Sequence, residues 1–136
     1  MNKPEFFVTP GYGERNLKLF HYSQAVKIGN RLELSGQGGW NDDWEFPESI
    51  TDEIAQAFRN VERTLAVAGA RWEYVIHVNS YHVGLDGDQE EINQAMTERF
   101  RHYMPGHAPV WTCLGVAALG DPKMRVEIRV TAILPE

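Results

Sequence analysis

The sequence has little cysteine and no long apolar run. Cys113 is the only cysteine among 136 residues, so a disulfide within the chain is excluded. No stretch is long and apolar enough to cross a bilayer. The N-terminus, MNKPEFFVTP, lacks the apolar centre of a signal peptide. We therefore expect a cytoplasmic protein with no membrane partner.

Positive charge is also scarce. Thirteen lysines and arginines stand against 19 aspartates and glutamates, which gives a formal net charge of −6. A surface that binds nucleic acid needs a basic patch or stripe, and no such stripe is present in the sequence. We expect no nucleic-acid partner, and this expectation argues against ribonuclease activity.

Metal-binding and triad patterns are missing as well. His77 and His82, and also His102 and His107, are five positions apart, a spacing that suits neither one face of a strand nor one face of a helix. Neither Cys-x-x-Cys nor His-Glu-x-x-His occurs. Ser35 lacks the Gly-x-Ser-x-Gly context of a nucleophilic serine. We expect no metal site, no cofactor and no Ser-His-Asp triad.

The C-terminal part of the chain shows the clearest pattern. Residues 110–116 alternate, and so do residues 124–132, with a turn predicted at residues 119–122. In the second segment every other residue from Met124 is apolar. The alternation predicts two closing strands of an antiparallel sheet with one buried face. Glu127 lies on the polar face, between two arginines.

The remaining elements follow from local signals. We expect an irregular arm at 1–14, a strand at 18–28, its hairpin partner at 31–37, an acidic aromatic loop at 40–49, a helix from Thr51 to Gly69, a strand at 74–83 and a helix at 88–103. The buried helix stripes are predicted as Ile54, Phe58, Val61, Leu65 and Ala68, and as Ile92, Met96, Phe100 and Tyr103.

These elements predict a single domain over residues 1–136, of the α+β class, in the order β-β-α-β-α-β-β with two helices on one sheet face. The chain is too short to cover the other face with a second layer. An uncovered face favours a homo-oligomer.

Four segments together resemble a known family. They are YSQAVKIGNRLELSGQ (22–37), QAFRNVERTLAVAGA (56–70), Asn93 with Phe100, and VWTCLGVAALGDPKMRVEIRVTAI (110–133). In this order they resemble the RidA/YjgF family of imine and enamine deaminases, from about Tyr22 to Ile133. The resemblance implies a chorismate-mutase-like fold assembled as a homotrimer with a central barrel. It also implies small-molecule clefts between subunits and hydrolysis of imines or enamines without a cofactor.

One site position departs from the family. The family has Pro-Ala-Arg-(Ser/Thr), whose arginine binds the substrate carboxylate, and this chain has Pro109-Val110-Trp111-Thr112. An indole offers only one neutral donor. The chain thus resembles a branch that lacks this arginine. We expect small imino acids to be poor substrates and a bulkier or more apolar substrate near Trp111, a muconate-type enamine being one candidate.

The resemblance assigns roles to the matching positions. Glu127 would activate the water that attacks the imine, whereas the pattern alone favours a solvated glutamate paired with Arg125 and Arg129. Tyr22 and Ser35 would donate hydrogen bonds to a ligand or to the water.

Four further residues are expected to bind substrate together with Trp111. Cys113 would contribute its backbone N–H and not its thiol, and Gly36 would let the backbone approach the ligand. Asn93 matches the family's helix asparagine. Arg129 is a candidate replacement for the missing arginine, and Arg125 is another.

Two alternatives remain open. A non-catalytic ligand-binding trimer is favoured by Trp111, and the deaminase is favoured by Glu127, Tyr22 and Ser35. The aromatic loop at 40–49 is either an ordinary surface loop or a wall of the cleft.

Overall fold

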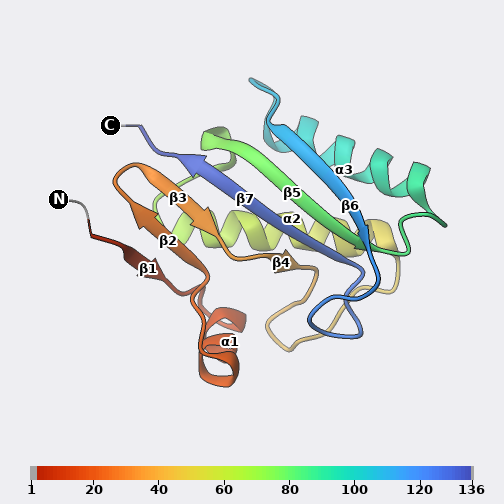
Figure 1. Cartoon of the computed structure of the whole chain (residues 1–136), viewed down its shortest axis with the longest axis horizontal. Helices are drawn as coiled ribbons and strands as arrows, with labels where there is room; N and C mark the ends of the chain where they lie inside the picture. The colour runs from red at the N-terminus through yellow and green to blue at the C-terminus, as the bar shows by residue number, and fades with distance from the viewer. Residues whose placement is uncertain (1–2, 136) are drawn as a thin grey trace.

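One mixed seven-stranded sheet organises residues 3–135, the part of the chain that the computed structural model describes (Figure 1). The strands are β1 (Glu5–Phe7), β2 (Ala25–Ile28), β3 (Arg31–Leu34), β4 (Gln37–Gly38), β5 (Val75–Val83), β6 (Val110–Val116) and β7 (Val126–Ile133). The helices are α1 (Tyr12–Phe20), α2 (Ile50–Val67) and α3 (Gln89–Tyr103), with a short 3-10 helix at Trp72–Tyr74. The sheet order is β1-β2-β3-β7-β5-β6, and β4 pairs with β7 beside β3.

The two helices predicted to cover the sheet are confirmed. In Figure 1, α2 and α3 both lie behind the sheet, so the face toward the viewer is uncovered. All five residues of the first predicted stripe are buried, as are Ile92 and Met96 of the second. The cap differs from the prediction: Ser49, not Thr51, accepts the N–H of Asp52 at 3.0 Å and begins α2. The α+β prediction is therefore correct, and β2, β3, α2, β5, α3, β6 and β7 follow the predicted order.

The predicted pairing of the two closing strands is wrong. β5 lies between them, antiparallel to β7 and parallel to β6. The physical reason is that β5, α3 and β6 form a strand-helix-strand unit, which returns β6 to the same sheet in the parallel sense. β7 then occupies the free side of β5, so β6 becomes an edge strand.

The prediction for the N-terminal part is also wrong. Residues 5–7 form β1, and most of the predicted strand at 18–28 is divided between the helix α1 and the short strand β2. The side chain of Glu14 accepts the N–H of Gly11 at 2.9 Å, which stabilises the start of α1. His21 ends the helix in the left-handed conformation, with φ 56°. The aromatic and β-branched residues of the segment 18–28 suggested a strand, but the local capping favours a helix up to Phe20.

A second, small core lies beside the sheet. It consists of Tyr12, Trp40 and Met124, with Trp44, Phe46 and Leu119 packed against it. It joins α1, the loop at 40–49 and the connection between β6 and β7. Asn60 of α2 supports the loop, because its side-chain amide donates to the carbonyl oxygens of Gly38 and Trp40 at 2.8 and 2.7 Å. These contacts place the aromatic loop against α1.

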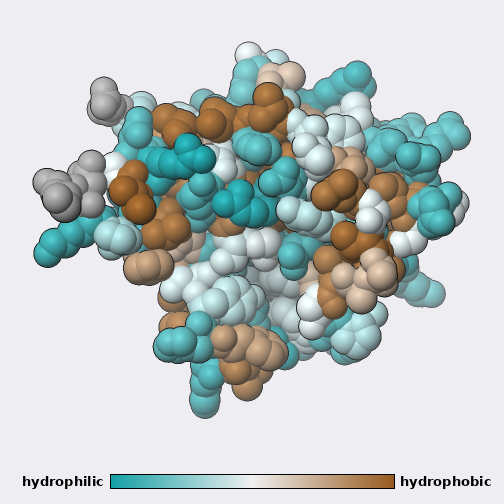
Figure 2. Space-filling model, in the orientation of Figure 1, coloured by the Kyte–Doolittle hydropathy of each residue, from teal (hydrophilic) through white to brown (hydrophobic). Residues whose placement is uncertain are grey.

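The uncovered sheet face carries both apolar and polar side chains. Val110 and Leu114 of β6 are 64% and 47% exposed and share this face with Glu127 and Arg129 of β7. Figure 2 shows apolar groups distributed between hydrophilic ones over the same face. Among the residues described, no helix combines the length and the apolar character that a membrane span requires.

Candidate functional site

Glu127 lies near the start of β7, on the uncovered face of the sheet. In β7 it is paired with Gly38 of β4 on one side and Tyr81 of β5 on the other. Its side chain is largely buried, and within residues 3–135 it makes no hydrogen bond or ion pair. Burial raises the pKa of the Glu127 carboxyl above its ordinary value. A half-buried carboxylate that forms no ion pair is suited to accept a proton.

The two arginines that flank Glu127 in the sequence do not pair with it. Arg125 Nε donates to Glu53 Oε1 at 2.7 Å, and Arg129 Nη2 lies 3.2 Å from Glu33 Oε1. The interpretation of Glu127 as a surface partner of these arginines is therefore wrong. Arg125 is also fixed by the buried Glu53 carboxylate, so it is not free to bind a substrate carboxylate.

Gly36 and Glu127 approach each other closely. A Cβ placed on Gly36 would lie only 2.5 Å from Glu127 Cδ and Oε1. The absence of a side chain at Gly36 is what allows the carboxyl group to lie over the chain between β3 and β4. The structure brings these two predicted site residues together.

Tyr22 belongs to the same group. Its hydroxyl oxygen accepts the side-chain amide N–H of Asn16 at 3.0 Å. Burial, and to a smaller extent the nearby charge of Glu127, raises the pKa of Tyr22 above its ordinary value of 10.0. The phenol thus stays protonated at neutral pH and keeps its own O–H available for donation.

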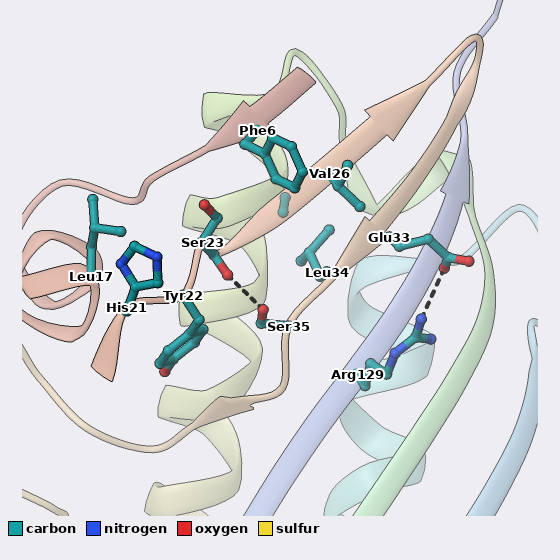
Figure 3. A pocket seen from close by; sticks show the side chains of 11 residues that line it. Phe6, Leu17, His21, Tyr22, Ser23, Val26, Glu33, Leu34, Ser35 and Arg129 are labelled. Atoms are coloured by element: carbon teal, nitrogen blue, oxygen red, sulfur yellow. Dashed lines mark hydrogen bonds and ion pairs between the residues drawn. The ribbon is translucent and has the colours of Figure 1, made fainter. Parts of the chain in front are cut away.

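Two cavities meet at Tyr22. We call the first the Glu127 cavity, with a volume of about 230 Å³. It is lined by Arg15, Asn16, Phe20, Tyr22, Trp40, Trp44, Gly120, Asp121, Met124 and Glu127. We call the second the Arg129 cavity, with a volume of about 520 Å³. It is lined by Phe6, Leu17, His21, Tyr22, Ser23, Ala25, Val26, Glu33, Leu34, Ser35 and Arg129 (Figure 3).

Ser35 and Arg129 lie in the larger of these cavities. Figure 3 shows Ser35 Oγ beside Ser23, to whose carbonyl oxygen it donates at 2.7 Å, and Arg129 beside Glu33. The Ser35 proton is therefore used within the protein. Ser35 and Arg129 therefore line a different cavity from Glu127.

Trp111, Cys113 and Asn93 form a second group, between the sheet and α3. The Trp111 indole N–H donates to Ser80 Oγ at 2.9 Å, and its ring packs edge-on against Phe100 at 5.1 Å. Cys113 Sγ lies 3.8 Å from Asn93 Oδ1. Strand alternation turns these β6 side chains toward the helix-covered face, whereas Glu127 points to the uncovered one.

Within one chain the predicted site residues thus lie in three places. Glu127, Tyr22 and Gly36 form the Glu127 group, and Ser35 and Arg129 line the Arg129 cavity. Trp111, Cys113 and Asn93 form the Trp111 group on the helix-covered side.

The cysteine has the surroundings of a structural residue. Burial raises the pKa of the Cys113 thiol above its ordinary value of 9.0. The thiolate is therefore disfavoured, as expected from its place in a strand. Within residues 3–135, no group of three or more His, Cys, Asp or Glu side chains is arranged to hold a metal ion.

Sequence reasoning missed six residues that line the Glu127 cavity: Arg15, Asn16, Phe20, Gly120, Asp121 and Met124. Arg15 and Asn16 belong to α1, where the sequence predicted an irregular arm up to residue 14 and a strand from residue 18. The carboxylate of Glu14, three positions after the Gly11 cap, was a local signal for the helix. No local signal indicates that Arg15 lies over the ring of Trp44.

Comparisons with known proteins cover almost the whole chain. The family model described as Endoribonuclease L-PSP matches residues 14–134. The chain is 33% identical over 125 residues to the RutC family protein YjgH of Escherichia coli (strain K12), covering 91% of this chain and 92% of the relative. It is 37% identical over 116 residues to 2-iminobutanoate/2-iminopropanoate deaminase of Dermatophagoides farinae, covering 83% and 85%. A solved structure of protein YjgH matches with a TM-score of 0.77 at 31% identity, covering 96% of this chain and 95% of that one.

Proposed function

The chain belongs to the RidA/YjgF family, whose family model is described as Endoribonuclease L-PSP, and we propose that it hydrolyses a reactive imine or enamine to a carbonyl compound and ammonia. The observation that carries the proposal is the Glu127 carboxyl, half-buried and without a hydrogen bond or ion pair among residues 3–135, in the same cavity as the protonated phenol of Tyr22. A relative of 37% identity is named as an imine deaminase, which supports the same reaction class.

The proposed reaction needs a base for the water that attacks the imine carbon and a proton donor for the imine nitrogen. Water adds to the imine carbon while Glu127 accepts one of its protons and passes it to the nitrogen. The resulting carbinolamine carries a hydroxyl and an amino group. Glu127 then transfers the hydroxyl proton to nitrogen, the C–N bond breaks, and ammonia leaves with the carbonyl product behind. The Tyr22 hydroxyl orients the water or the ligand by donating a hydrogen bond.

The test is Glu127→Gln, assayed by ammonia release from imines made in situ by an amino-acid oxidase, with the spontaneous rate subtracted. Glutamine has nearly the same shape but accepts no proton, so we expect a loss of roughly 10²–10⁴-fold in rate with the fold intact. The matched control is Glu73→Gln, because Glu73 is exposed and paired with Arg71. Full activity in Glu127→Gln would refute the proposal.

The alternative is a ligand-binding protein without catalytic activity. It is favoured by Trp111, which stands where the family has its carboxylate-binding arginine. A protein that binds carbonyl compounds but accelerates no imine hydrolysis would support it. Ribonuclease activity is not favoured, because the net charge of −6 opposes binding of a polyanion.

We further propose a cytoplasmic homotrimer of chorismate-mutase-like topology, with clefts between subunits. Two observations support the assembly. The first is the uncovered sheet face, and the second is that the Glu127 group and the Trp111 group lie apart within one chain. An intersubunit cleft would combine the Glu127 group of one subunit with the Trp111 group of its neighbour.

A further inference from the structure

Arg15 is the one arginine of the Glu127 cavity, and it has no carboxylate within 4.0 Å among residues 3–135. Three other arginines near the sheet and the aromatic loop are paired: Arg63 with Asp42, Arg125 with Glu53 and Arg129 with Glu33. The Arg15 guanidinium is partly buried and shares the cavity with Glu127 and Tyr22. A positive charge thus lies unpaired beside the proposed catalytic groups.

The guanidinium is held by an aromatic stack. Its Cζ lies 4.0 Å from the centroid of the Trp44 ring, and Trp44 stacks on Trp40 with ring centroids 4.5 Å apart. Trp44 is fixed in turn, because its indole N–H donates to Asp121 Oδ2 at 2.9 Å. The other oxygen of Asp121 accepts the N–H of Lys123 at 2.8 Å. Asp121 therefore positions the stack and does not form an ion pair with Arg15.

A hydrogen-bond chain connects Arg15 to Tyr22. Arg15 Nη1 donates to Asn16 Oδ1 at 2.9 Å, and Asn16 Nδ2 donates to the Tyr22 hydroxyl oxygen at 3.0 Å. Asn16 is buried, so this chain is well fixed. A guanidinium carries five N–H donors, and only one is used here. The remaining donors can bind an anion in a bidentate manner.

We propose that Arg15 binds the substrate carboxylate, a role that Trp111 cannot fill. Phe20, which is 64% exposed, and the partly exposed Trp44 line the same cavity and bind an aryl or other large apolar side chain of the same substrate. The substrate class is therefore the imine of an α-amino acid with a bulky, apolar side chain. The reaction part of this inference rests on the proposed deaminase function, whereas the binding part does not.

The two other candidate arginines fit this role less well. Arg125 is fixed by Glu53 and by the carbonyl oxygens of Pro47 and Glu48, which accept from its Nη2 at 3.1 and 3.0 Å. Arg129 lines the other cavity and is paired with Glu33. Only Arg15 combines free donors with a place beside Glu127.

The test measures binding without catalysis. Phenylpyruvate, a stable keto acid, is titrated against the protein and followed by tryptophan fluorescence and calorimetry, with pyruvate and the neutral ketone phenylacetone as comparisons. We expect phenylpyruvate to bind more tightly than either. Arg15→Met should weaken phenylpyruvate binding roughly 10- to 100-fold, because it removes charge-assisted hydrogen bonds, and should leave phenylacetone binding unchanged.

The matched control is Lys18→Met, which removes an exposed cation from the same helix. It should leave all three affinities unchanged. Arg15→Gln is the second variant, used if Arg15→Met loses its native circular dichroism; it should weaken phenylpyruvate binding in the same way. Phenylpyruvate binding within twofold of wild type in a folded Arg15 variant overturns the inference, as does wild-type protein that binds no carboxylate.

The two proposals fail separately. Arg15-dependent binding without any imine hydrolysis overturns the deaminase function and leaves the anion site standing. Imine hydrolysis that depends on Glu127, with KM for an aromatic imino acid unchanged in Arg15→Met, overturns the anion site and leaves the function standing.

Discussion

At the scale of single residues, Glu127 is partly buried and forms no ion pair among residues 3–135, and this combination affects stability as well as chemistry. A carboxyl whose pKa is raised by folding binds a proton more tightly in the native state than in the unfolded state. The native state is therefore favoured while the group is protonated, and this contribution is lost as the pH rises through the raised pKa. Above that pH, the buried carboxylate opposes folding.

This linkage predicts a pH-dependent difference between wild type and Glu127→Gln. Below the ordinary carboxyl pKa of 4.5 both side chains are neutral, so the two melting temperatures should nearly coincide. As the pH rises to 7.5, the Gln variant should become the more stable protein, because it has no charge to bury. Scanning calorimetry at a series of pH values measures the difference. A gap that stays constant with pH contradicts the assignment of a raised pKa to Glu127.

The sequence predicted part of the site and missed another part, for a reason that individual residues make clear. Glu127, Tyr22 and Gly36 were predicted because all three match motifs of the family. The structure places them close together. Arg15 and Asn16 carry no motif. The position of Arg15 depends on the ring of Trp44, which is distant along the chain. The position of Asn16 depends on the hydroxyl of Tyr22, which lies in the connection between α1 and β2. Local patterns contain no information on such contacts.

At the scale of elements, a single ion pair connects α2 to the beginning of β7. Both carboxylate oxygens of Glu53 are used, by the backbone N–H and by Nε of Arg125, each at 2.7 Å. The Glu53 side chain is fully buried. Arg125 also donates to two carbonyl oxygens of the segment before α2, so it fixes three parts of the chain at once.

We predict that Arg125→Met destabilises the protein by about 3–5 kcal/mol, because it leaves the buried Glu53 carboxylate unpaired. Arg129→Met is the comparison, since its partner Glu33 is partly exposed and such pairs contribute only about 0–1 kcal/mol. Urea unfolding of both variants measures the free energies. Equal effects from the two changes would contradict this ranking.

The elements themselves were predicted better than their pairing. The hairpin of β2 and β3 and the helix α2 depend on residues close together in the sequence, and both were predicted. The position of β5 between β6 and β7 depends on contacts between distant segments. The alternation of residues 110–116 indicated a strand but could not indicate its neighbour.

At the scale of the whole molecule, the sheet has helices on one side only. Leu114 is 47% exposed on the uncovered side, in register with Tyr81 and hence in the same row as Glu127. A protein with apolar groups on an open sheet face gains free energy by covering that face with further copies of itself.

We predict a mass in solution three times the 15.5 kDa of one chain, measured by light scattering with size-exclusion chromatography. Leu114→Glu should reduce the assembly to monomers, because it places a charge in the proposed interface. Leu19→Glu is the control, since Leu19 is exposed on α1 and not on the sheet. A wild-type monomer, or a Leu114→Glu protein that still forms trimers, would exclude this arrangement.

Helix α1 lies at the margin of the sheet (Figure 1). Tyr12 and Asn16 are buried and attach it to the rest of the fold, whereas residues 14 and 17–20 are exposed. Its outward residues therefore contribute little to the free energy that holds the main core together. Substitutions along this helix can alter the rim of the Glu127 cavity while the strand that carries the base stays unchanged. The fold thus separates a part that must remain constant, namely the sheet together with the buried Tyr12 and Asn16, from the exposed positions of α1, at which substitutions can change the substrate preference at a small cost in folding free energy.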